Sequence, residues 1–441
     1  MYMKMRGVRR CPVQPAVTLG LAPLSEGRIE SDGTLQCSYH GWQFDGRGAC
    51  THIPQLRGDA KAMQVACESR RSCVRAFPVQ VVHGLLWVRP DSSQQAHEEF
   101  AKNPAPPQTA IKELLGEPEV EGFRQTTQWY MRDVPMRFDT LCENILDPSH
   151  VPFTHHKVQG NRNNEKGTTT KLVDEISLEG FAFELDFQNP RFGVSVPAFK
   201  APNFVRYGNP IRSLNVFAVP TRPGWSRIYV TFMKVCRPGR AITVGTQGED
   251  TRQPGRLPWL VEKLYSMVEK ITWLEHITQR HPVLDGDNYI LHLQERALHE
   301  EHNSDWQKNF FMPAAADAST IAIRTWFNTF GGAVPTCEPG TPVAPRLTKR
   351  EALDRYSQHT VHCRHCQKAL RNVDLATAVV TAAGILVAGW LAARALMGVP
   401  LLSSATGLGL LAAALAGVVV AGLRSLRQQF FFVDYVHAER N

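Results

Sequence analysis

The stretch CENILDPSHVPFTHH, residues 142–156, contains two histidines, His150 and His155, that are five residues apart. A helix with a slight irregularity can bring both imidazoles to one side, with Asp147 one turn before His150 and Asn144 one turn earlier still. Two imidazoles and one carboxylate form the facial triad of non-haem iron(II) sites, which leaves coordination positions open. The stretch therefore predicts most of an iron site, whose carboxylate must come from elsewhere in the chain. His156 is interpreted as a spare histidine outside the ligand set.

A second candidate metal motif, CSYHGW, lies at residues 37–42. Cys37 and His40 have the C-x-x-H spacing at which a thiolate and an imidazole can bind zinc or iron, and the spacing alone is weak evidence. The surrounding residues place the pair on an aromatic, glycine-rich loop between short strands. The motif is half of a metal site, and it needs further ligands.

Together these motifs resemble those of the Rieske non-haem iron oxygenases. In that family two thiolates and two imidazoles hold a [2Fe–2S] cluster, and the resemblance assigns Cys37 and His40 to its second ligand loop. The first loop, a C-x-H, would fall at positions 17 and 19, where this chain has Val17 and Leu19. We expect that cluster assembly is impaired in this chain or that a preceding segment is missing.

Other cysteines do not restore that first loop. Cys11 and Pro12 begin like the family's CPH, but Val13 stands at the histidine position and the spacing is too long. The C-x-H of Cys50 and His52 lies downstream on another turn and is interpreted as a chance match.

For the mononuclear site, the resemblance implies that His150 and His155 bind iron(II) and that Asp147 links an iron ligand to the cluster of a neighbouring subunit. It also implies a third ligand in LDGDNYILHLQE, residues 284–295, for which we choose Asp287 over Asp285. Glu295 is a weaker candidate, interpreted as structural.

The sequence predicts an α+β protein of several segments. These are a truncated all-β Rieske domain (1–90), a linker (91–120), a catalytic domain with an antiparallel sheet of the helix-grip, START-like type (121–335), a second linker with a C-x-x-C (336–373), a two-helix transmembrane hairpin (374–424) and a tail (425–441). Strand patterns such as FAFELDF and RIYVTFMKV alternate with helical stretches in the catalytic domain.

The predicted hairpin rests on two blocks without charged residues, 375–393 and 395–423. Each can cross a hydrocarbon core of about 30 Å, which needs about 20 helical residues. A buried core hairpin is the alternative, but soluble helices of this length normally have a polar face. Basic residues on both outer flanks favour termini on the cytoplasm-like side, although Arg394 between the blocks argues mildly against this. The net charge of +8 without a long basic run argues against nucleic acid as a partner.

The C-x-x-C of Cys363 and Cys366 lies beside basic residues that lower a thiol pKa, and we interpret it as a redox dithiol. A zinc site with His362 or His365 is an alternative. The C-x-x-C followed by a hairpin resembles the chloroplast branch of the family, which contains pheophorbide a oxygenase, the inner-envelope translocon component and the protochlorophyllide-dependent translocon component, with chlorophyllide a oxygenase more distant.

This branch implies a tetrapyrrole substrate, ferredoxin as electron donor, thioredoxin as a partner of the dithiol, and a homotrimer. It further implies a thylakoid or inner-envelope location with the soluble domains in the stroma. Two other hypotheses remain, namely a non-catalytic redox sensor of the chloroplast import machinery and an incomplete, inactive oxygenase.

Overall fold

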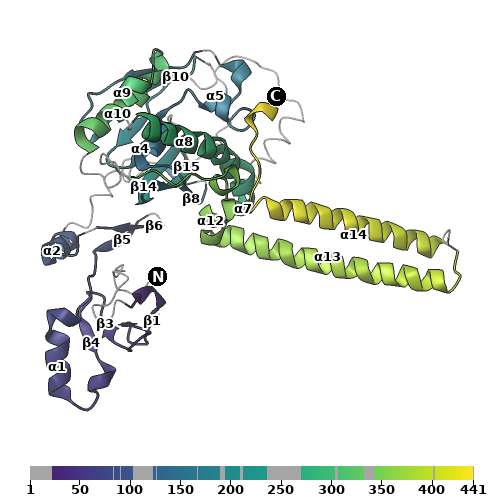
Figure 1. The fold of residues 1–441 in the computed structure, drawn as a ribbon, viewed down its shortest axis with the longest axis horizontal. Helices are drawn as coiled ribbons and strands as arrows, with labels where there is room; N and C mark the ends of the chain where they lie inside the picture. Colours follow the sequence, from purple (N-terminus) through teal and green to yellow (C-terminus); the bar gives the residue numbers. More distant parts are fainter. Residues whose placement is uncertain are drawn as a thin grey trace. The chain divides into compact units, whose positions relative to one another are not determined.

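The computed structural model describes residues 22–82, 84–89, 91–102, 123–125, 127–165, 167–188, 194–208, 212–235, 270–302, 306–331, 342–400 and 403–440. The chain forms two compact units, Met1–Glu113 and Leu114–Asn441 (Figure 1). The positions predicted for the first cluster loop, 17 and 19, lie outside the described residues.

Short antiparallel strands dominate the first unit. Its four-stranded sheet has the order β1-β2-β3-β4, and β5 pairs with β6 in a separate hairpin. The elements are β1 (Arg28–Ile29), β2 (Leu35–Gln36), β3 (Gln43–Phe44), β4 (Cys50–His52), α1 (Ala60–Glu68), β5 (Val79–Val82), β6 (Leu85–Val88) and α2 (Gln94–Lys102). The sequence predicts only strands here, and the structure adds α1 and α2, the latter inside the predicted linker.

A large antiparallel sheet forms the centre of the second unit. In the described residues its order is β11-β10-β12-β13-β14-β15-β7, with β9 beside β10 and β8 beside β15. The strands are β7 (Phe123–Gln125), β8 (Tyr130–Val134), β9 (Thr169–Leu172), β10 (Gly180–Asp186), β11 (Val194–Ser195), β12 (Ala198–Lys200), β13 (Phe204–Gly208), β14 (Arg212–Arg222) and β15 (Trp225–Val235). The predicted α+β class with an antiparallel sheet is confirmed.

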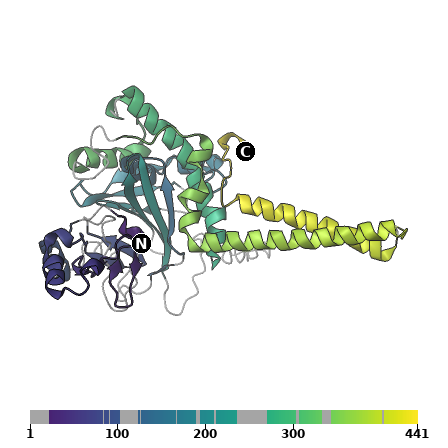
Figure 2. The same cartoon turned by 60° about the horizontal axis from the view of Figure 1, so that its bottom comes forward.

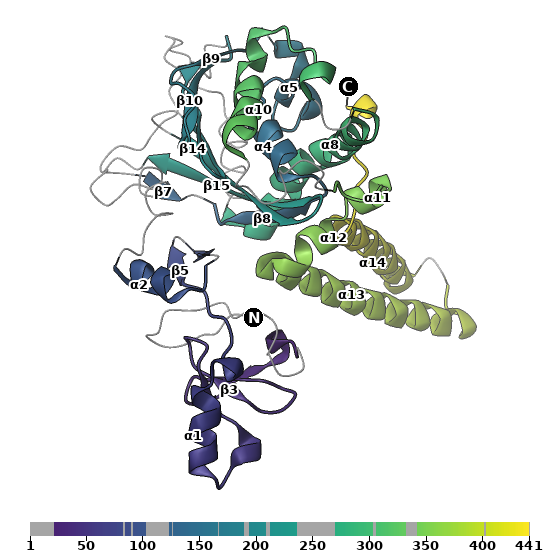
Figure 3. The ribbon, with the colours of Figure 1, turned by 60° about the vertical axis from the view of Figure 1, so that its left-hand side comes forward.

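Helices cover one face of this sheet, as Figure 3 shows for α4, α8 and α10. The helices are α4 (Phe138–Leu146), α5 (Val151–Thr154), α7 (Thr272–Glu275), the π-helix η5 (His276–Arg280), α8 (His281–His302), α9 (Trp306–Asn309), α10 (Ala318–Phe330), α11 (Lys349–Ala352), α12 (Arg355–Gln358) and the 3-10 turn η8 (Thr360–His362). Apolar side chains of α4, α8 and α10, among them Leu141, Leu284 and Trp326, pack with sheet residues in one buried cluster. This burial supplies the main favourable term in the folding of the unit.

Two long helices, α13 (Arg364–Leu396) and α14 (Ser404–Gln428), follow as an antiparallel pair (Figures 1 and 2). Both are long and apolar enough to cross a membrane, with mean hydropathies of 2.0 and 2.1. The two apolar helices are thus as the sequence predicts, but α13 begins at Arg364, inside the segment predicted as a linker. At the base of the pair, Arg427 Nε donates to Asp374 Oδ1 over 2.7 Å.

A buried ionic group anchors α8 against the sheet. The carboxylate of Asp285 accepts hydrogen bonds from Arg132 Nη1 on β8 (2.7 Å) and from Arg355 Nη2 on α12 (2.6 Å). The side chains of these residues are at most 2% exposed. Arg132 also donates to Gln358, so that β8, α8 and α12 are connected by one polar network.

We expect Asp285→Asn to lower the free energy of unfolding by about 3–5 kcal/mol, because it leaves two buried guanidinium groups without their counter-charge. Chemical denaturation of the detergent-solubilised protein, followed by circular dichroism, measures this change. Asp133→Asn is the matched control, since the Asp133–Arg227 pair is partly exposed and contributes about 1 kcal/mol or less. Equal losses in the two variants would contradict the anchoring role.

Candidate active site

His150 and His155 lie at the two ends of the short helix α5. Helix α4 ends at Leu146, since the residue before a proline is disfavoured in helical conformation and Pro148 follows Asp147. A new turn then starts with His150 and places His155 just after its last residue, Thr154. The two rings are 5.1 Å apart, at 79° to each other. The predicted irregular helix is therefore two helices with a break, which still brings both imidazoles to one side.

Asp287 on α8 completes this group. Its Oδ1 lies 3.4 Å from His155 Nε2 and 3.8 Å from His150 Nε2. Ligand atoms of the three residues all lie within 4.8 Å of one another. Asp285, two residues earlier on the same helix, points about 200° away around the axis and binds the buried arginines instead. The geometry therefore favours Asp287 over Asp285 as the carboxylate of the group.

Burial and neighbouring charges shift the pKa values of these three side chains in ways that favour the binding of a cation. Burial raises the pKa of Asp287 to about 7 and lowers that of His155 to about 3. Burial also disfavours the charge on His150, but the carboxylates of Asp147 and Asp287 outweigh it and raise the pKa of His150. Two imidazoles and a buried carboxylate fit the facial-triad donor set for iron(II), because a divalent cation stabilises the ionised carboxylate that burial disfavours.

Asp147 and Asn144 lie beside His150, as expected from the motif. Asp147 Oδ2 is 3.4 Å from His150 Nδ1, and Asp147 Oδ1 accepts from the backbone N–H of Ser149 over 2.7 Å. Asn144 Nδ2 lies 3.5 Å from His150 Nε2. A carboxylate on the far nitrogen orients a metal-binding imidazole and increases its basicity.

Two further candidates lie outside this group. His156 is buried, and its Nδ1 accepts from the backbone N–H of Arg162, which matches its interpretation as a spare histidine. Glu295 accepts from Thr140 Oγ1 (2.6 Å) and from the backbone N–H of Arg137 (2.8 Å). These contacts join α8 to the start of α4, so Glu295 has a structural position.

The segment after α14 returns to this site, which the sequence does not predict. Tyr435 Oη donates to the carbonyl oxygen of Thr154 over 2.7 Å, and His437 Nε2 lies 3.1 Å from the carbonyl oxygen of Gly286. Thr154 and Gly286 are the immediate neighbours of His155 and Asp287. Residues of the predicted tail therefore support both sides of the candidate metal group.

Gly286 permits the close approach of α8 to α5. A Cβ at this position would lie 3.1 Å from His155 Nδ1 and 3.2 Å from the Thr154 side chain. Such contacts are tighter than ordinary packing. A glycine beside the candidate ligand Asp287 is a signal that the sequence offers, but its meaning depends on knowing that α5 lies opposite.

In the first unit, Cys37 and His40 lie on the turn between β2 and β3. Cys37 is 3% exposed, whereas His40 is exposed. The backbone N–H of Cys37 donates to the carbonyl oxygen of Trp42 and that of Gly41 to the carbonyl oxygen of Cys37, with Gly41 at φ 75°. The loop thus has a fixed conformation, and among the described residues it supplies one thiolate and one imidazole, half of a Rieske ligand set.

Cys50 is directed elsewhere. Its sulfur lies 3.6 Å from that of Cys67, and its side chain is part of the first unit's core. This position agrees with the interpretation of its C-x-H spacing as a chance match.

Cys363 and Cys366 form a second group with two histidines that sequence reasoning missed, His276 and His359. His362 and His365, the neighbours considered from the sequence, do not belong to it. His276 is 87 residues before Cys363, so that no local spacing could have identified it.

Comparisons with known proteins relate both units to one family. The Rieske [2Fe-2S] domain family matches residues 20–78, and the Pheophorbide a oxygenase family matches residues 187–305. Pheophorbide a oxygenase, chloroplastic, from Oryza sativa subsp. japonica is 34% identical over 451 residues, covering 98% of this chain and 77% of that protein. Flavonoid 8-hydroxylase 2, chloroplastic, from Ocimum basilicum is 29% identical, covering 80% of this chain and 65% of that protein.

Among solved structures, the terminal oxygenase of carbazole 1,9a-dioxygenase from Nocardioides aromaticivorans IC177 matches with a TM-score of 0.47 at 16% identity. The match covers 76% of this chain and 86% of that one.

The raised pKa of Glu295 predicts a pH dependence of stability. Burial raises this pKa from 4.5 to about 7, so the folded protein keeps a proton that the unfolded chain releases at lower pH. The contribution to stability is complete below about pH 4.5 and is lost as the pH rises through about 7, by about 3 kcal/mol at most. Glu295→Gln, which carries no titrating proton, is expected to reduce this decline in unfolding free energies measured between about pH 5 and about pH 8.

Glu184→Gln on β10 is the control for this comparison, because it replaces an exposed glutamate. It is expected to keep the wild-type pH dependence. A Glu295→Gln profile identical to that of the wild type would show that the carboxyl group does not hold its proton in the folded state.

Proposed function

Because the chain belongs to the pheophorbide a oxygenase family of Rieske-type oxygenases, we propose that it oxygenates a chlorophyll-related tetrapyrrole of the pheophorbide a or chlorophyllide a type. The observation that carries the proposal is the convergence of His150, His155 and Asp287 in a donor set suited to iron(II). The family implies two cofactors, a Rieske [2Fe–2S] cluster and a mononuclear iron. In this proposal the three side chains hold the mononuclear iron.

Iron(II) bound by a facial triad supplies open coordination positions at which dioxygen can be activated. The protein's contribution is to present neutral imidazole nitrogens and an ionised Asp287 to the metal. Asp147 holds the ring of His150 in place through its Nδ1. The side chain of His150 is 19% exposed, against 2% for His155 and 5% for Asp287. Of the three, His150 therefore faces the solvent-accessible side, from which a substrate would approach.

Electron delivery belongs to the same proposal. Rieske oxygenases take electrons from a donor such as ferredoxin and use them to reduce dioxygen while an organic substrate is oxidised. We assign Cys37 and His40 to the cluster, with the exposed His40 on the side where a donor or a second subunit can approach. A homotrimer, in which Asp147 of one subunit connects to the cluster of the next, is part of the proposal. So is thioredoxin as a partner, if Cys363 and Cys366 act as a redox dithiol.

The relatives are chloroplast proteins, and we propose a chloroplast membrane, thylakoid or inner envelope, as the location of this chain. The support is the exposure of large apolar side chains along the helix pair, since a soluble hairpin would bury them. These side chains include Leu375, Ile385, Leu386, Leu408 and Val418, at 65–75% exposed. With α13 and α14 as a hairpin, both soluble units would lie on one side of the membrane, the stroma.

The test of the iron assignment compares His150→Ala and Asp287→Ala with Glu295→Gln. The first two are expected to lose the mononuclear iron and to reduce turnover of pheophorbide a or chlorophyllide a by more than about a hundredfold, because each removes a ligand. Glu295→Gln changes a carboxylate on the same helix outside the group and is expected to keep iron and turnover. Iron content, single-turnover assays and product analysis by mass spectrometry measure these outcomes.

Turnover within about tenfold of wild type in His150→Ala or Asp287→Ala would refute the assignment. Turnover of a flavonoid but of neither tetrapyrrole would retain the iron site and overturn the substrate class.

A further inference from the structure

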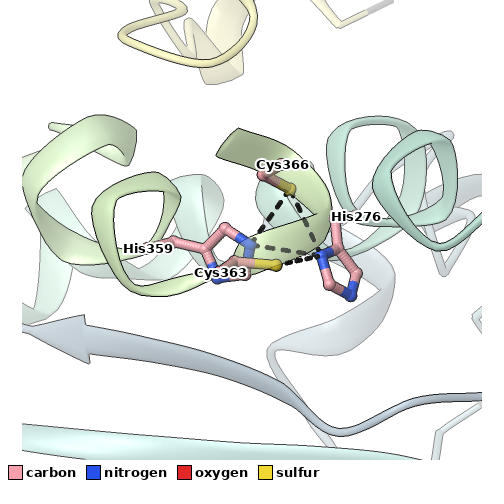
Figure 4. Close-up of side chains that lie close together, drawn as sticks. All are labelled: His276, His359, Cys363 and Cys366. Carbon is pink, nitrogen blue, oxygen red and sulfur yellow. Dashed lines mark hydrogen bonds between the residues drawn. The ribbon is translucent and has the colours of Figure 1, made fainter. Parts of the chain in front are cut away.

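We propose that His276, His359, Cys363 and Cys366 bind a structural zinc ion, at a site separate from the iron centre (Figure 4). His276 comes from η5, His359 from the turn after α12, and both cysteines from the start of α13. Ligand atoms of all four residues lie within 4.8 Å of one another. A Cys2His2 set is a common ligand set of closed, tetrahedral zinc sites.

The distances between donor atoms match a tetrahedron around zinc. Zinc–sulfur bonds of about 2.3 Å and zinc–nitrogen bonds of about 2.0–2.1 Å place tetrahedral donors about 3.3 Å apart for two nitrogens and about 3.5–3.6 Å apart for nitrogen and sulfur. Here His276 Nδ1 and His359 Nε2 are 3.1 Å apart. Cys366 Sγ lies 3.5 Å and 3.4 Å from these two nitrogens, and Cys363 Sγ lies 3.8 Å from His276 Nδ1.

His359 has a hydrogen-bond partner on its outer nitrogen that directs the inner nitrogen toward a metal, and His276 has a carboxylate near its outer nitrogen. His359 Nδ1 donates to the carbonyl oxygen of Met131, which leaves a lone pair on Nε2. His276 Nε2 makes no hydrogen bond and lies 3.8 Å from Glu275 Oε2, and the tautomer with its proton on Nε2 places a lone pair on Nδ1. Such partners on the far nitrogen are typical of metal-binding histidines. In the tautomers with both outer nitrogens protonated, two lone pairs would face each other at 3.1 Å, and a cation between them would remove their repulsion.

The surroundings are those of a structural site. His276, His359 and Cys366 are at most 1% exposed. Tyr130 stacks on the His359 ring with the centroids 4.6 Å apart, which fixes the ring orientation. Cys366 packs in a small apolar cluster with Ile277, Ala369, Leu370 and Phe430. An apolar shell of this kind limits access of water to the ligands.

The position of the site indicates which two helices a zinc ion would connect. His276 precedes Asp287 by eleven residues on a continuous run of π- and α-helix, which corresponds to about 16 Å. The cysteines belong to the first turn of the first apolar helix. The metal would therefore join the helix that carries the iron-binding aspartate to the base of the proposed membrane hairpin.

A disulfide between Cys363 and Cys366 is the competing use of the same atoms. A disulfide would also account for the two sulfur atoms. It would leave the two buried imidazole nitrogens facing each other with no ion between them. The participation of both histidines is what favours a metal over a dithiol.

Metal analysis of the full-length protein in detergent tests the proposal. The purified wild type is expected to contain about one zinc per chain in addition to iron. Cys366→Ser and His276→Asn are expected to lose most of that zinc. His362→Asn, which changes an exposed histidine next to the site, and Asp287→Ala, which disables the iron group, are expected to keep it. Retention in Asp287→Ala separates this zinc from zinc bound at the iron site.

Thiol labelling provides a second measurement that needs no variant. At the partly exposed Cys363, a zinc thiolate is expected to resist alkylation until a chelator is added, whereas a free thiol reacts without a chelator and a disulfide reacts only after reduction. Mass spectrometry of the peptide that contains both cysteines distinguishes these three states. Cobalt(II) in place of zinc is expected to give the visible and near-ultraviolet bands of a tetrahedral thiolate site.

Three results would overturn the proposal. The first is a wild type without zinc after expression and purification with zinc supplied. The second is a zinc content that Cys366→Ser and His276→Asn leave unchanged. The third is labelling that reveals free thiols or a disulfide at these cysteines in the purified protein.

Discussion

The buried carboxylate of Asp285 is the interaction on which the second unit depends. It lies between two arginines, one from the sheet and one from α12, and all three side chains are almost fully buried. A charge in such a place is tolerated only when it is paired and hydrogen-bonded, so the rotation of α8 about its axis is fixed. That rotation directs Asp287, two residues later, toward His150 and His155. The same network reaches α12, and the next residue after that helix is the zinc-binding candidate His359.

Much of the iron group could be predicted from the sequence, because its parts are local. The spacing of Asn144, Asp147, His150 and His155 carries the information within one short stretch, and each lies where the motif places it. The choice between Asp285 and Asp287 could not be derived from spacing, since the two residues are only two positions apart in the same stretch. It depends on which side of α8 meets the arginines, and this is decided by contacts across about 150 residues of chain.

The second metal group shows the limit of prediction from sequence. The sequence shows its C-x-x-C motif, but its two histidines come from a π-helix far upstream and from a turn four residues before Cys363. Histidines at such separations form no sequence pattern. Spacing alone makes His362 and His365 as plausible, as zinc ligands, as the two histidines that the structure brings together. For the same reason, the sequence does not predict the contacts of Tyr435 and His437 with the neighbours of the candidate iron ligands. These contacts form because the two apolar helices make a hairpin, which returns the chain to the unit that contains α5 and α8.

That return has a consequence for the order of assembly. The wall of the iron site beside His155 and Asp287 is made partly by residues that follow the second apolar helix. In a chain whose hairpin has not yet formed, Tyr435 and His437 are not held at the carbonyl oxygens of Thr154 and Gly286. The contacts that flank His155 and Asp287 are therefore completed only after the two apolar helices have paired.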